Sequence, residues 1–539
     1  MKRIPMPETI GQARAGTGVR VAAIALSMMS FFVSACGSPG ASTRLKAAYR
    51  FVDGSERAEM TVDYGAGPFQ PGRAARTGRL ATVSFPAASI NDETRFVLGA
   101  PAQSLVANTD DVPVSNRGVA QITLRFPPRL ANASRMLLLP SIKKNKSWQP
   151  LAQQRLNLSG TGTSRIAFAI PGLEKEIGEK HSFAVDAYSI DWGPEVSYET
   201  RDVAVGEDAR LEFGYGILEP AWDQGPVTFR ISACLDSNCE ELFAYKSDPT
   251  NTIDRRWRDA ACDLTRFAGK TVRFLFETRH EAAASNSFSL PVWANPTVYV
   301  PAPADDDRPN VILLSIDTLR ADHLSVYGHE HETSPFIDRT FGEGGTVFEN
   351  PVAAASNTSP SHMSIFTGLQ PSEHGIQTGL ERLPIWMHPL AEPLRAAGIE
   401  TGAVTENGWL SVRHGFGRGF NVYAENKSPN IMAPTGQVDV TFRRASEWLA
   451  RNANKHFFLF LHTFQVHDPY APPFEYRNLF VERNGETVGD SAERHLREVV
   501  AYDQEIRYTD DQLDLLFRCL LYTSPSPRDV EESRMPSSA

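Results

Sequence analysis

The chain has 539 residues, of which 41% are hydrophobic and 22% charged, and its formal net charge is −10 at pH 7. This composition excludes an intrinsically disordered chain and supplies enough apolar material for a buried core. The negative charge argues against a broad face for binding nucleic acid. At about 150 residues per domain, the length predicts three or four domains. Histidine is unevenly placed, because 11 of the 13 lie between His323 and His495.

The N-terminus has the features of an export signal. Basic residues precede the apolar run 21–35, which is shorter than the roughly 20 residues of a membrane-spanning helix. The run ends in small residues at Cys36 and resembles a bacterial lipoprotein signal. That resemblance implies removal of residues 1–35, lipid on Cys36 and a tether over 36–47. We therefore expect an exported protein, lipid-anchored to the cell envelope on its periplasmic or outer-membrane face. An ordinary signal peptide with an incidental cysteine is the alternative.

Export makes disulfide bonds chemically possible. Cys234 and Cys239 flank the turn-like segment Leu235–Asn238, so they are candidates for a bond that staples a hairpin. Cys262 would then have no partner in this region. The alternative, in which these thiols stay reduced and buried, remains open.

Residues 48–300 read as β-structure, in one or two domains. Short alternating runs recur between turn signals, a spacing typical of a β-sandwich and unlike βαβ units. The predicted strands with the clearest alternation are Ala120–Phe126, Arg165–Ile170, Ser182–Tyr188, Val227–Ala233 and Thr271–Glu277.

The second half of this region, about 196–300, carries a more distinctive segment. Arg256–Asp259 and Asp263–Val272 resemble a pattern of jelly-roll domains similar to galactose-binding modules. In such a domain Trp222, Trp257 and Trp293 would be platforms for stacking sugars. The alternative, which we favour, makes them core aromatic residues.

The pattern changes after the stiff, charged linker 301–307. The apolar run Asn310–Ile316 predicts a central parallel strand, and it ends at Asp317. Ligands of open α/β sheets bind outside the carboxyl ends of the strands, where Asp317 would lie. An Asp that only caps the next segment is the alternative. A second apolar strand, His456–Leu461, precedes the polar segment Gln465–Tyr470.

Residues 308–518 resemble the N-terminal part of a sulfatase-type domain of the alkaline phosphatase superfamily. The resemblance runs through Arg308–Val311, Asp317–Asp322, Tyr327-Gly328, Thr333–Asp338, Thr358–His362, Phe366–Gly368, His374-Gly375, His467–Tyr470, Tyr502-Asp503 and Tyr508–Asp510. So many ordered matches are more specific than one short motif. They imply an α/β fold that follows the all-β region in the chain and has a central, mostly parallel sheet with flanking helices.

The resemblance implies a metal-dependent ester hydrolase and assigns roles to single residues. Asp317 matches a metal-binding acid, and Thr358 occupies the position of a nucleophile that also contacts the metal. His467 matches a histidine that contacts the transferred anionic group, and His362, in the same motif as Thr358, is a further catalytic candidate. The cofactor would be one divalent cation, with Ca²⁺, Mg²⁺, Mn²⁺ and Zn²⁺ equally compatible. The substrate would be an anionic ester, and a glycan-linked ester fits this class.

Departures from the family pattern bear on the substrate. Sulfatases commonly use a formylglycine made from Cys or Ser in Cys/Ser-x-Pro-x-Arg, and Thr358 cannot give that aldehyde by the same oxidation. His362 replaces the arginine of the pattern, and Thr318 stands where a second acid often follows Asp317. A threonine nucleophile suits the phosphate and phosphonate ester hydrolases of the superfamily. Ser356 and Ser359 are the other hydroxyls beside it.

The sulfatase-like region lacks a segment that the family carries. No acid followed by His or Asn, the usual second pair of metal ligands, occurs after His467. Residues 519–539 read instead like translated adapter sequence, so we expect native sequence to end near Arg518. The domain 308–518 would then be incomplete and the 539-residue chain inactive. A natural disordered terminus is the alternative.

Two function classes follow from the sequence. The first is a lipid-anchored, metal-dependent hydrolase of sulfuric or phosphoric esters. The second is a glycan-binding or surface-binding lipoprotein whose sulfatase-like domain is degenerate and not catalytic.

Overall fold

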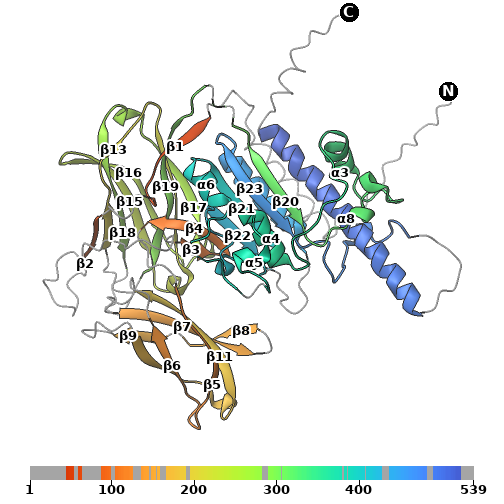
Figure 1. Cartoon of the computed structure of the whole chain (residues 1–539). Helices are drawn as coiled ribbons and strands as arrows, with labels where there is room; N and C mark the ends of the chain where they lie inside the picture. Colours follow the sequence, from red (N-terminus) through yellow and green to blue (C-terminus); the bar gives the residue numbers. More distant parts are fainter. Residues whose placement is uncertain are drawn as a thin grey trace, which may run out of the picture. The chain divides into compact units, whose positions relative to one another are not determined.

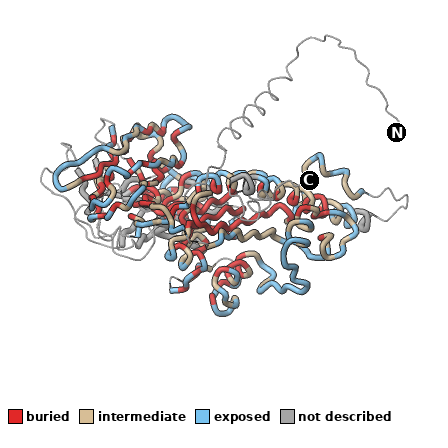
Figure 2. The backbone as a smooth tube through the Cα atoms, turned by 90° about the horizontal axis from the view of Figure 1, so that it is seen from above, coloured by how far each residue is buried: buried red, intermediate tan, exposed pale blue. Residues whose placement is uncertain are grey.

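The structure is a computed structural model in which residues 43–516 form one compact unit. It describes residues 44–53, 59–63, 87–98, 104–125, 135–144, 147–152, 154–157, 165–189, 195–281, 289–304, 306, 308–378, 381–384, 386–406, 408–427, 436–481 and 490–523. The predicted signal, Cys36 and the chain beyond Thr523 lie outside these ranges. Figure 2 shows many buried positions along the inner parts of the tube and many exposed positions on its outer loops.

Residues 104–189 form two antiparallel sheets. The larger has β5 (Ser104–Pro113), β11 (Lys180–Ser189), β7 (Arg135–Lys144) and β8 (Ser147–Pro150) in that order, with β9 (Gln154–Asn157) also on β7. The smaller pairs β6 (Ala120–Arg125) with β10 (Arg165–Ile170). Alternate residues such as Phe183 and Val185 are fully buried, as a strand with one covered face requires.

A second β region is a sandwich of two sheets. One sheet has the order β16 (Asn238–Ser247), β15 (Val227–Leu235), β18 (Thr271–His280), β12 (Glu195–Glu199) and β2 (Glu59–Asp63), and β13 (Val203–Ala204) also pairs with β18. The facing layer contains β17 (Arg258–Asp263), β14 (Arg210–Ile217) and β19 (Pro291–Pro301), and β1 (Leu45–Arg50) pairs with β19. All five strands predicted from alternation are present, so the predicted sandwich class is confirmed.

Trp293 lies at the centre of the sandwich core. Its indole ring contacts Phe213 of the same layer and Phe229 and Phe276 of the opposite sheet, with ring centroids 5.1–5.6 Å apart. Trp293 is 1% exposed and is a core residue. Trp222 and Trp257 are covered in part by Arg255 and Arg95, whose guanidinium groups lie 5.3 and 5.2 Å from the ring centroids. The structure therefore gives all three tryptophans packing roles.

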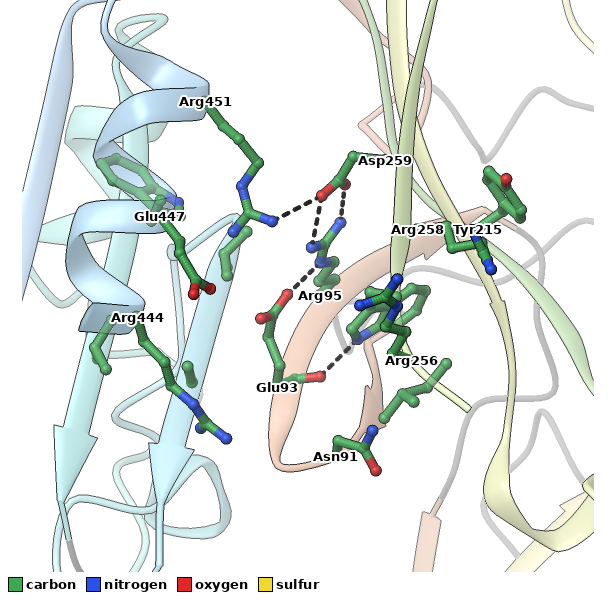
Figure 3. Close-up of a pocket in the computed structure, with 16 residues that line it drawn as sticks. Asn91, Glu93, Arg95, Tyr215, Arg256, Arg258, Asp259, Arg444, Glu447 and Arg451 are labelled. Atoms are coloured by element: carbon green, nitrogen blue, oxygen red, sulfur yellow. Dashed lines mark hydrogen bonds and ion pairs between the residues drawn. The ribbon is translucent and has the colours of Figure 1, made fainter. Parts of the chain in front are cut away.

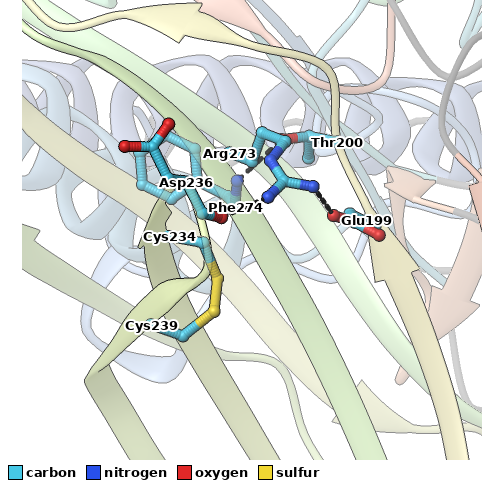
Figure 4. The surroundings of a disulfide bond; sticks show 7 residues. All are labelled: Glu199, Thr200, Cys234, Asp236, Cys239, Arg273 and Phe274. Carbon is cyan, nitrogen blue, oxygen red and sulfur yellow. Dashed lines mark hydrogen bonds and ion pairs between the residues drawn. A yellow bond between two sulfur atoms is a disulfide. The ribbon is translucent and has the colours of Figure 1, made fainter.

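The predicted hairpin staple is present. Cys234 of β15 lies directly opposite Cys239 of β16, and the two form a disulfide bond across the turn (Figure 4). Arg273 of β18 bonds the backbone oxygen of Asp236 in this turn and the carboxylate of Glu199 on β12. Cys262 is a free, buried thiol, and burial raises its pKa to about 11.

The C-terminal region is built on a parallel sheet with the order β22 (Val422–Asn426), β21 (Glu400–Glu406), β23 (Phe457–Thr463) and β20 (Val311–Ile316). Every residue of β21 and β23 is buried, as expected for apolar strands covered on both faces. Phe458 and Phe460 of β23 pack on the side of Phe366, whereas Phe457 contacts Trp448 on the opposite side. The predicted α/β class is confirmed.

The helices lie along this sheet and beyond it (Figure 1). They are α3 (Pro335–Ile337), which continues as a π-helical turn (Asp338–Glu343), α4 (Thr358–Thr367), α5 (Pro371–His374), α6 (Ala391–Ala396), α7 (Val438–Asn452) and α8 (Asp490–Thr523). Short 3₁₀ helices are Glu174–Glu176, Glu219–Ala221, Thr252–Asp254, Thr265–Phe267, Ala321–His323, Ser325–Tyr327, Val412–His414 and Phe474–Tyr476. Across the described helices, no stretch has both the length and the apolar character needed to cross a bilayer.

The parallel sheet is continuous with the sandwich. Strand β4 (Glu93–Leu98) runs antiparallel to β22 and also pairs with β19, and β3 (Ala87–Ile90) pairs with β4. An edge strand exposes unpaired backbone groups, and β4 covers that edge of β22. No sequence pattern had predicted this pairing.

A buried arginine strengthens the junction (Figure 3). Arg95 of β4 is 4% exposed and bonds the carboxylates of Glu93 and Asp259, and Asp259 also accepts a hydrogen bond from Arg451 of α7 at 3.0 Å. These groups line a cavity of about 530 Å³. One carboxylate of the sandwich thus binds both β4 and a helix of the α/β region.

Gly402 of β21 is required by the packing of α7. A Cβ atom at this position would lie 2.4 Å from Cε2 of Trp448, whose side chain is buried. We expect Gly402→Ala to lower the free energy of unfolding by about 1–3 kcal/mol, because the ring cannot move away without opening the core. Chemical denaturation measures the change. Gly408→Ala is the matched control, since nothing lies within 4 Å of its Cβ position; equal losses in both variants would contradict this account.

Candidate active site

The structure brings two residues predicted from the sequence into direct contact. Asp317 follows β20 at the carboxyl end of the sheet, and Thr358 is the first residue of α4. The Oγ1 hydroxyl of Thr358 donates a hydrogen bond to Oδ2 of Asp317 at 2.9 Å. The N-terminal turn of a helix leaves backbone N–H groups unpaired. A hydroxyl, a carboxylate and an anion-binding helix start therefore meet at one point.

The turn that carries Asp317 is held from two sides. Thr318 has a left-handed backbone, with φ of 59°, a conformation that costs energy for a residue other than glycine. Its hydroxyl donates to the carbonyl oxygen of Val466 at 2.8 Å, in the loop after β23. The Tyr502 hydroxyl of α8 donates to the Thr318 carbonyl oxygen and accepts from the Arg320 amide, both at 2.8 Å. These bonds fix the direction of the Asp317 side chain.

A third residue of the site, His462, was missed in the sequence. It pairs with Ser315 across β23 and β20, and its Nε2 lies 3.5 Å from Oδ2 of Asp317. The side chain is 1% exposed, and neither ring nitrogen has a hydrogen-bond partner among the described residues. The available signal was a single histidine near the carboxyl end of an otherwise apolar strand.

His362 lies one helical turn after Thr358 and is buried. Its Nδ1 is 2.8 Å from the Thr358 carbonyl oxygen, and its Nε2 is 2.8 Å from Oγ of Ser315. Its ring centroid lies 5.1 Å from that of His462. Burial, and then the neighbouring His462, lower the pKa of His362 to about 4. The ring is therefore neutral near pH 7 and does not supply the positive charge of the arginine it replaces.

Asp317 is charged in this setting. Burial alone would raise the pKa of its carboxyl group, but His462 and the Thr358 hydroxyl outweigh that effect and lower it. A carboxylate, a hydroxyl oxygen and an imidazole nitrogen without a partner are together a donor set that suits a divalent cation. The fit rests on Nε2 of His462, which lies 3.5 Å from Oδ2 of Asp317 and has no hydrogen-bond partner among the described residues.

The structure places His467 away from these contacts. It lies in the loop after β23, where its ring stacks on Phe464 with centroids 3.8 Å apart. Its Nδ1 is 2.7 Å from the Asp468 carbonyl oxygen. No contact of His467 with Asp317 or Thr358 occurs among the residues described, so its catalytic role stays a prediction.

The hydroxyls beside Thr358 have other environments. Ser359 is 1% exposed and donates to the Trp409 carbonyl oxygen at 2.7 Å, while Ser356 is exposed in the segment before α4. Among these three hydroxyls, Thr358 is the one bonded to Asp317.

Buried carboxylates hold the loops around the site. Glu406, at the carboxyl end of β21, accepts hydrogen bonds from the backbone amides of Gln437 and Phe464 at 3.0 and 2.9 Å. Glu505 of α8 accepts from Ala471 N at 2.8 Å and from the Gln465 side chain at 2.6 Å. Burial raises the pKa of both acids, to about 7 for Glu505. The strand ends are thus tied together by bonds to acidic side chains.

Comparison with known proteins agrees with this geometry. Residues 309–522 match the family model described as Sulfatase. This part of the chain is a sulfatase-family domain. The resemblance inferred from the sequence motifs is thereby confirmed.

Curated relatives include several sulfatases. An N-acetylgalactosamine-6-O-sulfatase of Bacteroides thetaiotaomicron is 33% identical over 105 residues, which are 19% of this chain and 20% of the relative. Arylsulfatase A of Bos taurus is 30% identical over 136 residues, 22% of this chain and 27% of the relative. The matches thus span about a fifth to a quarter of those proteins. Among solved structures, the phosphonate monoester hydrolase of Agrobacterium radiobacter aligns with a TM-score of 0.31 and 17% identity, over 40% of this chain and 59% of that chain.

The buried His362 predicts a pH dependence of stability. Its pKa is about 4 in the folded protein and about 6.5 when unfolded, so the unfolded state binds its proton first as pH falls. Stability is therefore lost between about pH 6.5 and pH 4, by on the order of 3 kcal/mol. We expect His362→Gln to remove that part of the loss, as measured by urea unfolding at several pH values. His388→Gln, at a side chain 74% exposed, is the control; the same flattening there would refute the assignment.

Proposed function

We propose that the sulfatase-family domain hydrolyses anionic esters with a divalent cation and with Thr358 as the nucleophile. The observation that carries the proposal is the hydrogen bond from the Thr358 hydroxyl to Asp317 at the start of α4. The family match and the named activities of the curated relatives support hydrolysis of sulfuric or phosphoric esters.

Each side chain of the site has its own role in the proposed reaction. Asp317, Thr358 and His462 would hold the cation, which when bound acidifies a hydroxyl and neutralises charge on the ester oxygens. Because its pKa is low, Asp317 is a poor proton acceptor, and its role is to orient the Thr358 oxygen. With the cation bound, the Thr358 hydroxyl would lose its proton to solvent water. Its oxygen would then attack sulfur or phosphorus, and the bond to the ester oxygen would break. The amides at the start of α4 bind the anionic oxygens.

The proton for the leaving oxygen needs a donor, and His467 is our candidate. It is half-buried in the loop after β23, so a modest movement of that loop would be needed to reach a bound ester. Water then cleaves the threonyl ester and restores the hydroxyl.

We infer a preference for phosphate or phosphonate esters over sulfate esters. A formylglycine hydrolase releases sulfate by way of an aldehyde hydrate, which a threonine side chain cannot form by the same oxidation. A threonyl ester must instead be cleaved by water. An ester carried on a glycan belongs to this substrate class. The alternative function, binding without turnover, would leave Thr358 without a catalytic role.

The test compares variants at the three neighbouring hydroxyls. The protein is made from the complete reading frame of its locus, with the 539-residue chain in parallel, and assayed with aryl phosphate, aryl phosphonate, phosphodiester and aryl sulfate. We expect Thr358→Ala to lower kcat/KM at least about 1,000-fold, and removal of divalent cations to abolish turnover. Thr358→Ser should retain more activity than Thr358→Ala.

Ser356→Ala is the matched control, because its hydroxyl is exposed and lies two residues from Thr358. Loss of activity in Ser356→Ala with full activity in Thr358→Ala would refute the assigned nucleophile. Equal background rates in all proteins would refute catalysis and favour the binding function.

We also propose that the protein is a lipoprotein of the bacterial cell envelope. The basis is the signal-like segment that ends at Cys36. Expressed with its signal, the protein should incorporate labelled palmitate and sediment with membranes, because two or more acyl chains give stable anchoring. Cys36→Ser should lose the label and leave the membrane fraction. Unchanged labelling of Cys36→Ser would contradict the anchor.

A further inference from the structure

A second cluster of metal-ligating side chains lies outside the candidate active site. His323 ends a 3₁₀ helix, His329 follows the left-handed Gly328, and Asp503 lies on α8. The Nδ1 atom of His323 is 2.6 Å from Oδ1 of Asp503, and the Nε2 atom of His329 is 3.1 Å from Oδ2. The three side chains are 13%, 14% and 2% exposed. Two imidazoles thus converge on one buried carboxylate.

The carboxylate of Asp503 is costly to bury without compensation. The two histidines can compensate the buried charge by donating N–H hydrogen bonds to the carboxylate. A cation bound between the imidazole nitrogens and the carboxylate, in place of those two protons, would compensate it as well. Zinc binds imidazole nitrogen at about 2.0–2.1 Å and carboxylate oxygen at about 2.0–2.2 Å. The potential ligand atoms here all lie within 4.8 Å of one another. Small side-chain rotations would therefore bring them around one ion.

We propose that His323, His329 and Asp503 bind one zinc ion, with water completing the coordination. Two imidazoles and a carboxylate are ligands that zinc prefers, whereas Mg²⁺ and Ca²⁺ prefer oxygen. None of the three residues belongs to the donor set of Asp317, Thr358 and His462. The zinc proposal therefore does not depend on the proposed catalytic activity.

The ion would clamp the segment 321–334 to α8. The chain just after this segment is already bonded to α8, because Asp510 accepts hydrogen bonds from the backbone amides of Phe336 and Ile337 at 2.8 and 2.9 Å. The ring of His323 also packs edge-on against Tyr502, with centroids 4.9 Å apart. Because the Tyr502 hydroxyl holds the turn after Asp317, a zinc ion at this site would stabilise the support of the candidate active site.

A competing group of possible ligands provides the control. Glu176, Glu179 and His181 also approach one another in the β region. Glu179 is 66% exposed and Glu176 is paired with Lys144, so a metal there would have to displace an ion pair. We assign no ion to that group, and His181→Asn tests the choice.

The test measures zinc binding by the 539-residue chain in an Asp317→Asn background, which weakens the candidate catalytic metal site. Competition with a zinc chelator should give one high-affinity ion per chain. Asp503→Asn and His329→Asn should each weaken binding at least about tenfold, and His181→Asn should not change it. Cobalt in place of zinc should give the strong visible absorption of a four-coordinate site. Binding that survives Asp503→Asn, or that is lost in His181→Asn, would overturn the proposal.

A measurement without ligand variants covers the case in which they fail to fold. Amide hydrogen exchange of the Asp317→Asn chain is compared with and without zinc. Zinc should slow exchange in 321–334 and around Asp503 on α8. Protection confined to 174–181, or no protection anywhere, would refute the site.

Discussion

The parallel pairing of β23 with its two neighbours is the constraint on which the candidate site depends. His462 lies opposite Ser315 on one side and Thr405 on the other. Because the register is fixed, the ends of β20, β23 and β21 fall at one edge of the sheet. Asp317, the loop after β23 and Glu406 are brought together there, and α4 adds Thr358 from the next layer. A shift of one residue in this register would turn His462 to the other face and separate it from Asp317.

The elements that local pattern determines were predictable, and those that depend on distant partners were not. Strands such as Arg165–Ile170 show their alternation in the sequence, and the apolar β23 indicates a strand with two covered faces. Asp317 was indicated by its place at the end of an apolar strand and by the family motifs, and Thr358 by the family motifs. His462 was missed because one histidine in an apolar strand reads equally well as a core residue. The pairing of β4 with β22 has no local signal, since it joins segments of different regions.

The histidine-rich half of the chain uses its imidazoles in different ways. His362 and His462 are buried near one carboxylate, where burial keeps His362 neutral. His323 and His329 meet a second carboxylate on α8. Composition alone could mark this half as unusual, but only the fold separates the two groups. Tyr502 connects them mechanically, because it contacts His323 with its ring and the turn after Asp317 with its hydroxyl.

The strand pairing between β4 and β22 also affects the order in which the protein can fold, because the sheet cannot form fully until β22 has been synthesised. Lys427, just after β22, forms an ion pair with Asp92, which precedes it by 335 residues. During synthesis β4 therefore emerges long before β22, and its residues Glu93 to Arg95 stay without that neighbouring strand until β22 is made. Such long-range pairing slows folding and leaves strand edges open to wrong partners. A fragment cut between the sandwich and the α/β region would carry an open strand edge on both products, which makes the two poor candidates for separate expression.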